Sequence, residues 1–191
     1  MKTKSIISTL ALAVTLIFGS TVMAQSKMEK GTKMVGGAEM YPSKDIVSNA
    51  VNSKDHTTLV AAVKAAELVE TLQSDGPFTV FAPTNAAFNK LPKGTVETLL
   101  KPENKEKLQA VLTYHVIAGK YSGKAIMKAI KKGDGKATFK TVNGASLTAM
   151  MDGKMLVLMD GSGNKSMVTI ADVNQSNGVI HVVDTVVLPG M

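Results

Sequence analysis

The stretch Thr79-Val80-Phe81-Ala82-Pro83-Thr84-Asn85-Ala86-Ala87-Phe88 decides the fold of this chain. Its first half is rich in β-forming residues and predicts a strand. Pro83-Thr84 then starts a short helix, with Thr84 as the N-cap. Two further segments follow in order: Tyr114-His115-Val116-Ile117-Ala118-Gly119, and Asn177-Gly178-Val179-Ile180-His181-Val182-Val183-Asp184, which runs on to Pro189.

The pattern of apolar residues differs on the two sides of residue 135. Before it, apolar residues at helical spacing predict one amphipathic helix from about Leu59 to Leu72, and others over 101–113 and 122–132. The helix over 101–113 leads into a strand that contains Tyr114 and His115. After it, strands are predicted over 138–142, 146–151, 155–159, 167–172 and 179–188, with a hairpin at Asp152-Gly153. Helices followed by strands indicate an α+β fold.

The three quoted segments resemble the two conserved boxes and the Tyr-His segment of the fasciclin domain family, over roughly residues 42–189. The resemblance implies a wedge of two β-sheets, with helices packed over the N-terminal half of the domain at 42–191. It also implies a protein that is not an enzyme and that mediates adhesion or contact with a cell surface or matrix. Some relatives carry apolar pigments, so a carrier of a small, carotenoid-like apolar ligand is the alternative.

The N-terminal residues are typical of an exported protein. Lys2 and Lys4 precede an apolar run over 6–18, and Val22-Met23-Ala24 fits a signal peptidase site. We therefore expect a signal peptide over 1–24, cleavage after Ala24, and a periplasmic or extracellular mature chain. The run is too short to span a bilayer, and no other stretch is apolar enough. Residues 25–41 are polar and glycine-containing, which predicts a flexible leader.

The composition excludes several classes of partner and chemistry. The net charge is +7, but every basic residue is Lys, and the chain has no Trp and no Cys. Without Arg forks or aromatic stacking platforms, nucleic-acid binding is disfavoured. Without Cys, the domain is free of disulfides and depends on its core alone.

Catalytic and metal sites receive little support from the sequence. Ser176, His181 and Asp184 could be arranged as a triad on paper, but the chain has no Gly-x-Ser-x-Gly elbow. Asp160-x-Ser162-x-Asn164 imitates the start of a calcium loop, yet it lacks the required glycine and final glutamate. We expect no catalytic residue, no bound metal and no cofactor.

Four methionines gather around one predicted hairpin: Met150, Met151, Met155 and Met159. Thioethers are soft ligands that suit Cu(I), so the hairpin could carry copper in the periplasm. Apolar residues at every position over 155–159 instead predict a strand buried on both faces, with methionine filling the core. We expect core packing. The leader methionines Met28, Met34 and Met40 are not expected in the core, and they keep the copper alternative open.

Two groups of residues are candidates for partner binding. The resemblance allows an adhesive role for Tyr114 and His115, but we expect a structural role for His115, in which a neutral imidazole ties two backbone segments together. Lysines at positions i, i+4, i+7 and i+8 share one side of the predicted helix over 122–132, opposite Ala125, Ile126, Ala129 and Ile130. They are Lys124, Lys128, Lys131 and Lys132. Such a face is either simply solvated or a contact for an envelope or matrix protein or an anionic glycan.

Overall fold

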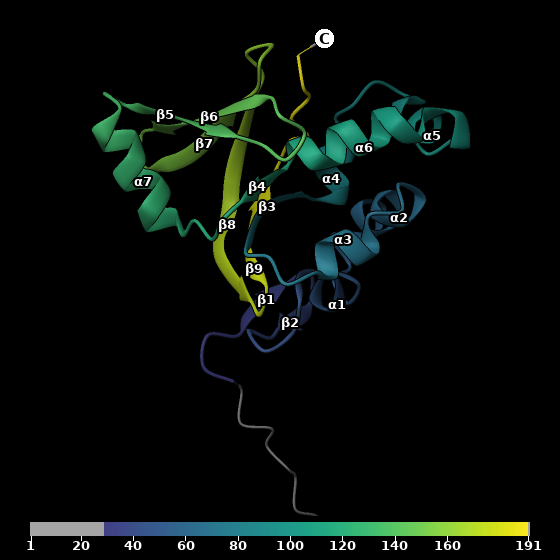
Figure 1. Cartoon of the computed structure of the whole chain (residues 1–191), viewed down its shortest axis with the longest axis horizontal. Coiled ribbons are helices and arrows are strands. Elements are labelled where there is room, and N and C mark those ends of the chain that lie inside the picture. The colour runs from purple at the N-terminus through teal and green to yellow at the C-terminus, as the bar shows by residue number, and fades with distance from the viewer. Residues whose placement is uncertain (1–28, 191) are drawn as a thin grey trace, which may run out of the picture.

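A seven-stranded sheet forms the centre of the computed structural model, which describes residues 29–190 (Figure 1). Within that range, β3 and β9 pair in parallel and the other neighbours are antiparallel. The strands lie in the spatial order β4 (Val116–Ala118), β3 (Phe78–Pro83), β9 (Gly178–Val183), β8 (Lys165–Gln175), β7 (Met155–Met159), β6 (Ser146–Asp152) and β5 (Lys136–Lys140).

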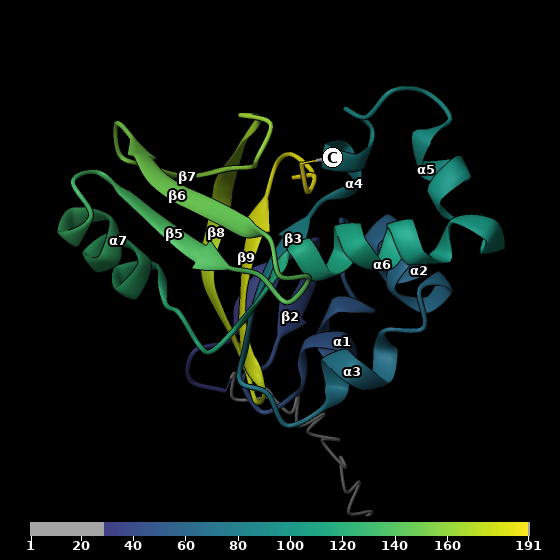
Figure 2. The same cartoon turned by 45° about the horizontal axis from the view of Figure 1, so that its top comes forward.

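The long strand β8 joins the two halves of this sheet. Its first residues, Lys165 to Met167, pair with β7, and the rest pairs with β9. The register with β9 shifts on both sides of Ile170, and Asp172 has a positive φ of 58°. Such irregularities bend a strand, so two sheets diverge from β8 as a wedge (Figure 2). The predicted α+β wedge is confirmed.

Most of the helices cover one side of the wedge, and α7 lies on the other (Figures 1 and 2). The helical elements are α1 (Ile46–Ala50), α2 (Thr57–Ala65), α3 (Val69–Gln73), α4 (Asn85–Phe88), α5 (Thr95–Leu99), the 3-10 turn η1 (Pro102–Asn104), α6 (Lys105–Tyr114) and α7 (Gly123–Lys132). The single helix predicted to Leu72 is divided into α2 and α3, because Glu67 takes a left-handed φ of 55°. No helix within residues 29–190 has the length and apolarity to cross a membrane.

Two hydrophobic cores lie on opposite faces of β3 and β9. Val80 and Ile180 pack in the core beneath α1–α6, whereas Phe81 and Val183 pack in the core beneath α7. Successive side chains of a strand point to opposite faces, so both strands must be apolar on both sides. This explains why the first and last quoted segments are nearly continuous apolar runs.

Part of the predicted flexible leader is instead an ordered hairpin. β1 (Lys33–Val35) pairs with β2 (Ala38–Met40) through Gly36-Gly37, whose positive φ angles suit a tight hairpin turn. Val35 and Met40 are buried in the core beneath α1–α6. The expectation that leader methionines stay out of the core is therefore wrong for Met40. The predicted signal peptide over 1–24 and Met28 lie outside the described residues.

Asparagines of the quoted segments fasten the helical layer to the sheet. Asn177, in the turn before β9, accepts a hydrogen bond from the Ile46 N–H (3.1 Å) and donates to the Leu72 carbonyl (2.8 Å). Asn85, after β3, accepts from the Thr58 N–H at the start of α2 (2.9 Å). These side chains satisfy backbone groups at helix ends, which explains their place in the segments that specify the fold.

Candidate functional site

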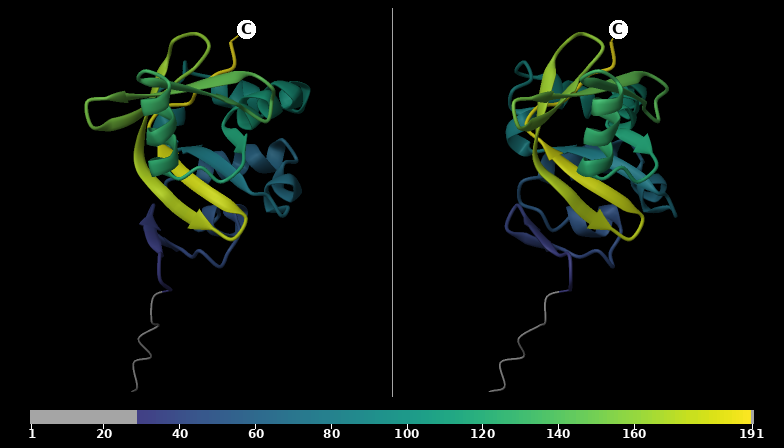
Figure 3. Two further views of the ribbon diagram at one scale, coloured as in Figure 1. Left: turned by 60° about the vertical axis from the view of Figure 1, so that its left-hand side comes forward. Right: turned by 90° about the vertical axis from the view of Figure 1, so that its left-hand side faces the viewer.

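The lysines predicted to share one side of a helix form an exposed surface on α7, which we call the basic face: Lys124, Lys128, Lys131 and Lys132. The helix begins at Ser122, whose Oγ accepts a hydrogen bond from the Ala125 N–H. Ile126 and Ile130 anchor its opposite side in the core. Ala125, predicted on that apolar side, is exposed. Figure 3 shows α7 on the outside of the domain.

The basic face is not neutralised by acidic side chains nearby. The three ion pairs of the described part of the chain involve Lys90, Lys105 and Lys165, none of which lies on α7. Met127, at the edge of this face, is 39% exposed. Lys136 and Lys140 on β5 are exposed on the other face of the sheet, because Ala137 and Phe139 between them pack in the core beneath α7. The fields of the four lysines on α7 therefore add over that helix.

Tyr114 and His115 are buried at the junction of α6 and β4, and they do not form the predicted strand. Tyr114 is the last residue of α6, and its hydroxyl donates to the Ser146 carbonyl (2.8 Å). His115 follows as the C-cap, and β4 begins only at Val116. A direct contact between either side chain and a partner would require the fold to open.

Both ring nitrogens of His115 are engaged within the protein. Nδ1 donates to the Val111 carbonyl (2.8 Å), and Nε2 accepts from the Val187 N–H (3.2 Å). Burial lowers its pKa from 6.5 to about 4, against the opposing effect of the bond to Val111. A neutral imidazole thus ties α6 to the C-terminal segment, the structural alternative drawn from the sequence.

The structure does not bring together the catalytic triad that the sequence allowed, Ser176, His181 and Asp184. His181 is stacked on Phe81, and its Nε2 donates to the Tyr121 carbonyl (2.9 Å). Asp184 instead accepts from the Met167 N–H (2.8 Å). His181 and Asp184 therefore hydrogen-bond backbone groups of the sheet and its connections, and not each other.

The calcium-like loop is organised around a buried carboxylate. Asp160 accepts hydrogen bonds from the N–H groups of Ser162 (3.0 Å), Asn164 (2.9 Å) and Leu188 (3.1 Å). Its oxygens are thus used to hold the β7–β8 loop against the C-terminal segment. Across residues 29–190 there is no group of three or more His, Asp or Glu that could hold a metal ion.

The methionine hairpin differs from the predicted core strand. Met155 is 40% exposed, and Met150, Met151 and Met159 are half-buried. Cross-strand pairing places Met150 and Met167 on either side of Val157, which is buried although it belongs to neither core. The residues on the other face of β7, Leu156 and Leu158, do pack in the core beneath α7. Methionines therefore cover an outer face of the sheet.

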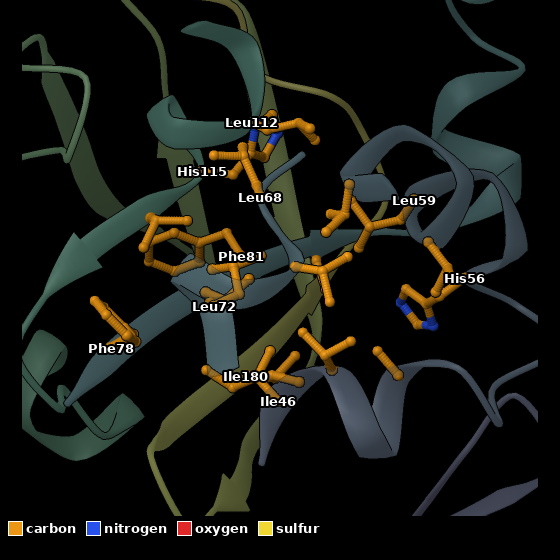
Figure 4. A pocket seen from close by; sticks show the side chains of 18 of the residues that line it. Ile46, His56, Leu59, Leu68, Leu72, Phe78, Phe81, Leu112, His115 and Ile180 are labelled. Carbon is orange, nitrogen blue, oxygen red and sulfur yellow. The ribbon is translucent and has the colours of Figure 1, made fainter. Parts of the chain in front are cut away.

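An apolar cavity of about 80 Å³ lies between the helical layer and the β3–β9 part of the sheet (Figure 4). Its wall comes from segments far apart in the sequence, which is why sequence patterns did not identify it. The side chains labelled in the figure are Ile46, His56, Leu59, Leu68, Leu72, Phe78, Phe81, Leu112, His115 and Ile180.

His56 is one of two histidines in this wall, and no sequence pattern singled it out. It is 3% exposed and stands at the start of α2, beside Leu59 in Figure 4. Its Nδ1 lies 2.8 Å from the Ser53 Oγ, and Nε2 has no hydrogen-bond partner among the described residues. Burial lowers its pKa; the nearby Ala82 carbonyl acts in the opposite direction without reaching hydrogen-bond geometry at Nε2.

Known proteins resemble this chain over most of its length. It is 44% identical to Protein sll1483 of Synechocystis sp. over 194 aligned residues, which cover all of both chains. It is 37% identical to the Immunogenic protein MPB70 of Mycobacterium bovis, over 73% of this chain and 66% of that protein. It is also 35% identical to human Periostin, over 71% of this chain but 15% of that protein.

A solved structure and a family model agree with these relatives. The structure, a FAS1 domain pair from the insect cell adhesion molecule Fasciclin I, superposes with a TM-score of 0.68. It covers 76% of this chain and 51% of that chain, and at 18% identity it supports the fold. The Fasciclin domain model matches residues 54–189. The chain therefore belongs to the fasciclin domain family, as its quoted segments predicted.

Proposed function

We propose that this protein is exported and acts without catalysis, by binding an anionic glycan or acidic envelope protein through the basic face of α7. The observation that carries the proposal is a row of exposed lysines, free of ion pairs in the described structure, on a helix whose other side is held in the core. Relatives support a role at the cell surface: one is a cell adhesion molecule, and another is named a Cell surface glycolipoprotein.

Electrostatics favours a polyanionic partner for this surface. Lysines that share one side of a helix present their charges to the same ligand, which raises local anion concentration and association rate. Compact ammonium groups suit repeated point contacts with sulfate or carboxylate groups better than forked recognition of one group. Because the lysines are exposed, salt weakens the contact as the Debye length falls from ~8 Å at physiological ionic strength to ~3 Å at 1 M.

Charge reversal on the basic face tests this proposal. Lys124→Glu, Lys128→Glu and Lys131→Glu are combined in one variant, and retention on heparin and on the protein's own cell envelope is measured against salt. We expect retention to be lost while the melting temperature stays nearly unchanged, because exposed substitutions usually shift stability little.

A matched control separates the location of the charges from their number. Lys93, Lys101 and Lys107 are exposed around α5, η1 and α6, and their change to Glu alters the net charge by the same amount. This control should keep its retention. Equal losses in both variants, or full envelope binding by the α7 variant, would show that α7 is only a solvated face.

Export and maturation form a separate part of the proposal. The basic start, the short apolar run and Val22-Met23-Ala24 support cleavage after Ala24. Intact mass spectrometry of the exported protein should give a chain that starts at Gln25. A mature form that keeps residues 6–18 would contradict the proposal.

A further inference from the structure

One face of strands β5–β8 is not covered by a helix. α7 contacts β5 and β6, and the residues that those strands turn toward it, among them Ala137 and Leu147, pack in the core beneath α7. Figures 1 and 2 show α7 on one side of β5–β7 and no helix on the other. Residues paired directly across neighbouring strands share a face, so the register identifies the apolar residues of the open side. They form what we call the methionine face: Met150, Met155, Val157, Met159 and Met167.

The methionine face is an apolar surface that water reaches. Met155 and Met167 are 40% and 38% exposed, and Met150 and Met159 are half-buried. Val157 lies between Met150 and Met167 in the pairing and is only 3% exposed, so neighbouring side chains close over it. The solvated face of an antiparallel sheet is usually polar, and an exposed apolar patch with a polar rim is typical of an interaction site. Methionine side chains are flexible and polarizable, which lets such a surface adapt to a partner.

The charges beside the methionine face have a definite sign and place. Lys136 pairs directly with Met150, and Lys140 lies four residues further along the same side of β5, the edge strand of the sheet. Neither lysine takes part in an ion pair of the described residues. Lys165 and Asp152 reach each other across β7 (3.8 Å), so their charges offset one another. The uncompensated charge is therefore positive, and it lies along the β5 edge.

We propose that the methionine face docks an amphipathic helix of a partner protein, whose apolar stripe covers β6–β8 and whose acidic flank faces Lys136 and Lys140. An apolar helix face laid on an apolar surface is a recurrent mode of recognition. A second copy of this chain fits less well, because it would add the same lysines. The site is separate from the basic face, since it lies on the side of β5–β7 away from α7.

The dimensions of the strands fit such a helix. The five residues of β7 extend over about 16 Å, which corresponds to about three turns of helix. Lys136 and Lys140 lie about 13 Å apart along β5, close to the roughly 11 Å between helical residues at positions i and i+7. Two acidic residues separated by two turns on one flank of the helix therefore reach both lysines, while the apolar stripe lies over the methionines.

Two synthetic helical peptides test the proposal on the native protein. Both carry leucines at positions i, i+3, i+4 and i+7, and their flanking residues are Glu in one and Lys in the other. Binding is followed by NMR of ¹³C-labelled methionine methyl groups. The Glu peptide should move the signals of Met155 and Met167 and leave that of Met34, which is exposed on β1, in place. It should bind about fivefold more tightly than the Lys peptide, because two exposed ion pairs differ between them.

Charged substitutions locate the contact on the surface. Met155→Glu combined with Met167→Glu should weaken binding of the Glu peptide by about tenfold, whereas the control Met34→Glu should bind it as the native protein does. Lys136→Glu combined with Lys140→Glu should reverse the preference between the two peptides. If a variant fails to fold, the native spectra decide alone.

Four results would overturn the proposal. The first two are fixed signals of Met155 and Met167 in the native protein, and movement of Met127 on α7 without them. The third is an equal loss of binding in the Met34→Glu control. The fourth is movement of the same signals with protein concentration in the absence of peptide, which would make a second copy of the chain the occupant of the methionine face.

Discussion

Acidification should destabilise this protein through His115, by an amount that the structure allows us to work out. Burial holds the pKa of His115 at about 4 in the folded chain, against 6.5 for an unperturbed histidine. In the unfolded chain the imidazole takes up a proton near pH 6.5, whereas in the folded chain it stays neutral until about pH 4. The unfolded state therefore binds more protons in this window, and the free energy of unfolding falls as the pH falls.

The size of the effect follows from the shift. At about 1.4 kcal/mol per pKa unit, the full loss from His115 is about 3 kcal/mol, reached below pH 4. By pH 5 about 2 kcal/mol of it should already be gone. His56 and His181, whose pKa values burial also lowers, act in the same direction. Asp45 and Asp184 have pKa values below 3.8, so their contributions disappear only at lower pH.

Urea unfolding followed by circular dichroism at pH 7 and pH 5 measures this loss. The variant His115→Phe should be less stable at pH 7, because it leaves the Val187 N–H without a partner. Its loss of stability between the two pH values should nevertheless be smaller by about 2 kcal/mol. Equal stability of the native protein at both pH values, or an NMR titration of His115 near pH 6.5, would refute the reasoning.

Three variants test other parts of the fold by thermal or urea melts. Gly178→Ala should strongly destabilise the domain, since an added Cβ would overlap the Phe78 carbonyl; wild-type stability would contradict the β3–β9 contact. Asp160→Ala should cost about 2–4 kcal/mol by leaving N–H groups unpaired, and calcium should not change the melting temperature of the native protein. Replacing Met155 and Met159 together by Leu should cost below about 1.5 kcal/mol, and Cu(I) titration should reveal no tight site lost in that variant.

Local signals in the sequence were sufficient wherever neighbouring residues determine the conformation. Thr84 caps α4 through its hydroxyl, as predicted, because capping involves residues within one turn. The apolar run over 155–159 and the Asp152-Gly153 turn located β7 and its hairpin with β6. The basic face followed in the same way from helical spacing alone.

Predictions failed where long-range contacts override local preference. Gly36 and Gly37 predict flexibility, but they close a hairpin that is held in place because Val35 and Met40 enter the core. The long helix predicted to Leu72 is interrupted at Glu67, whose φ is positive, and Leu68 beyond it packs against the core beneath α1–α6. In both places tertiary packing outweighs propensity.

The cavity was beyond sequence reasoning for a different physical reason. A void arises where side chains from separate elements fail to meet, and no periodicity records that failure. The sequence does show a serine three positions before a histidine at the start of a helix. It does not show that Ser53 takes one ring nitrogen while the other faces no partner.

The two strands at the centre of the sheet separate the apolar cavity from the basic face. Val80 and Ile180 line the cavity, while Val183 packs in the core beneath α7. Charge reversal on α7 changes exposed side chains that do not contact His56, so the effects of the two changes on stability should add, as those of distant sites without shared partners do. His56→Leu should therefore change the free energy of unfolding by the same amount with and without charge reversal on α7, and it should leave retention on the cell envelope intact.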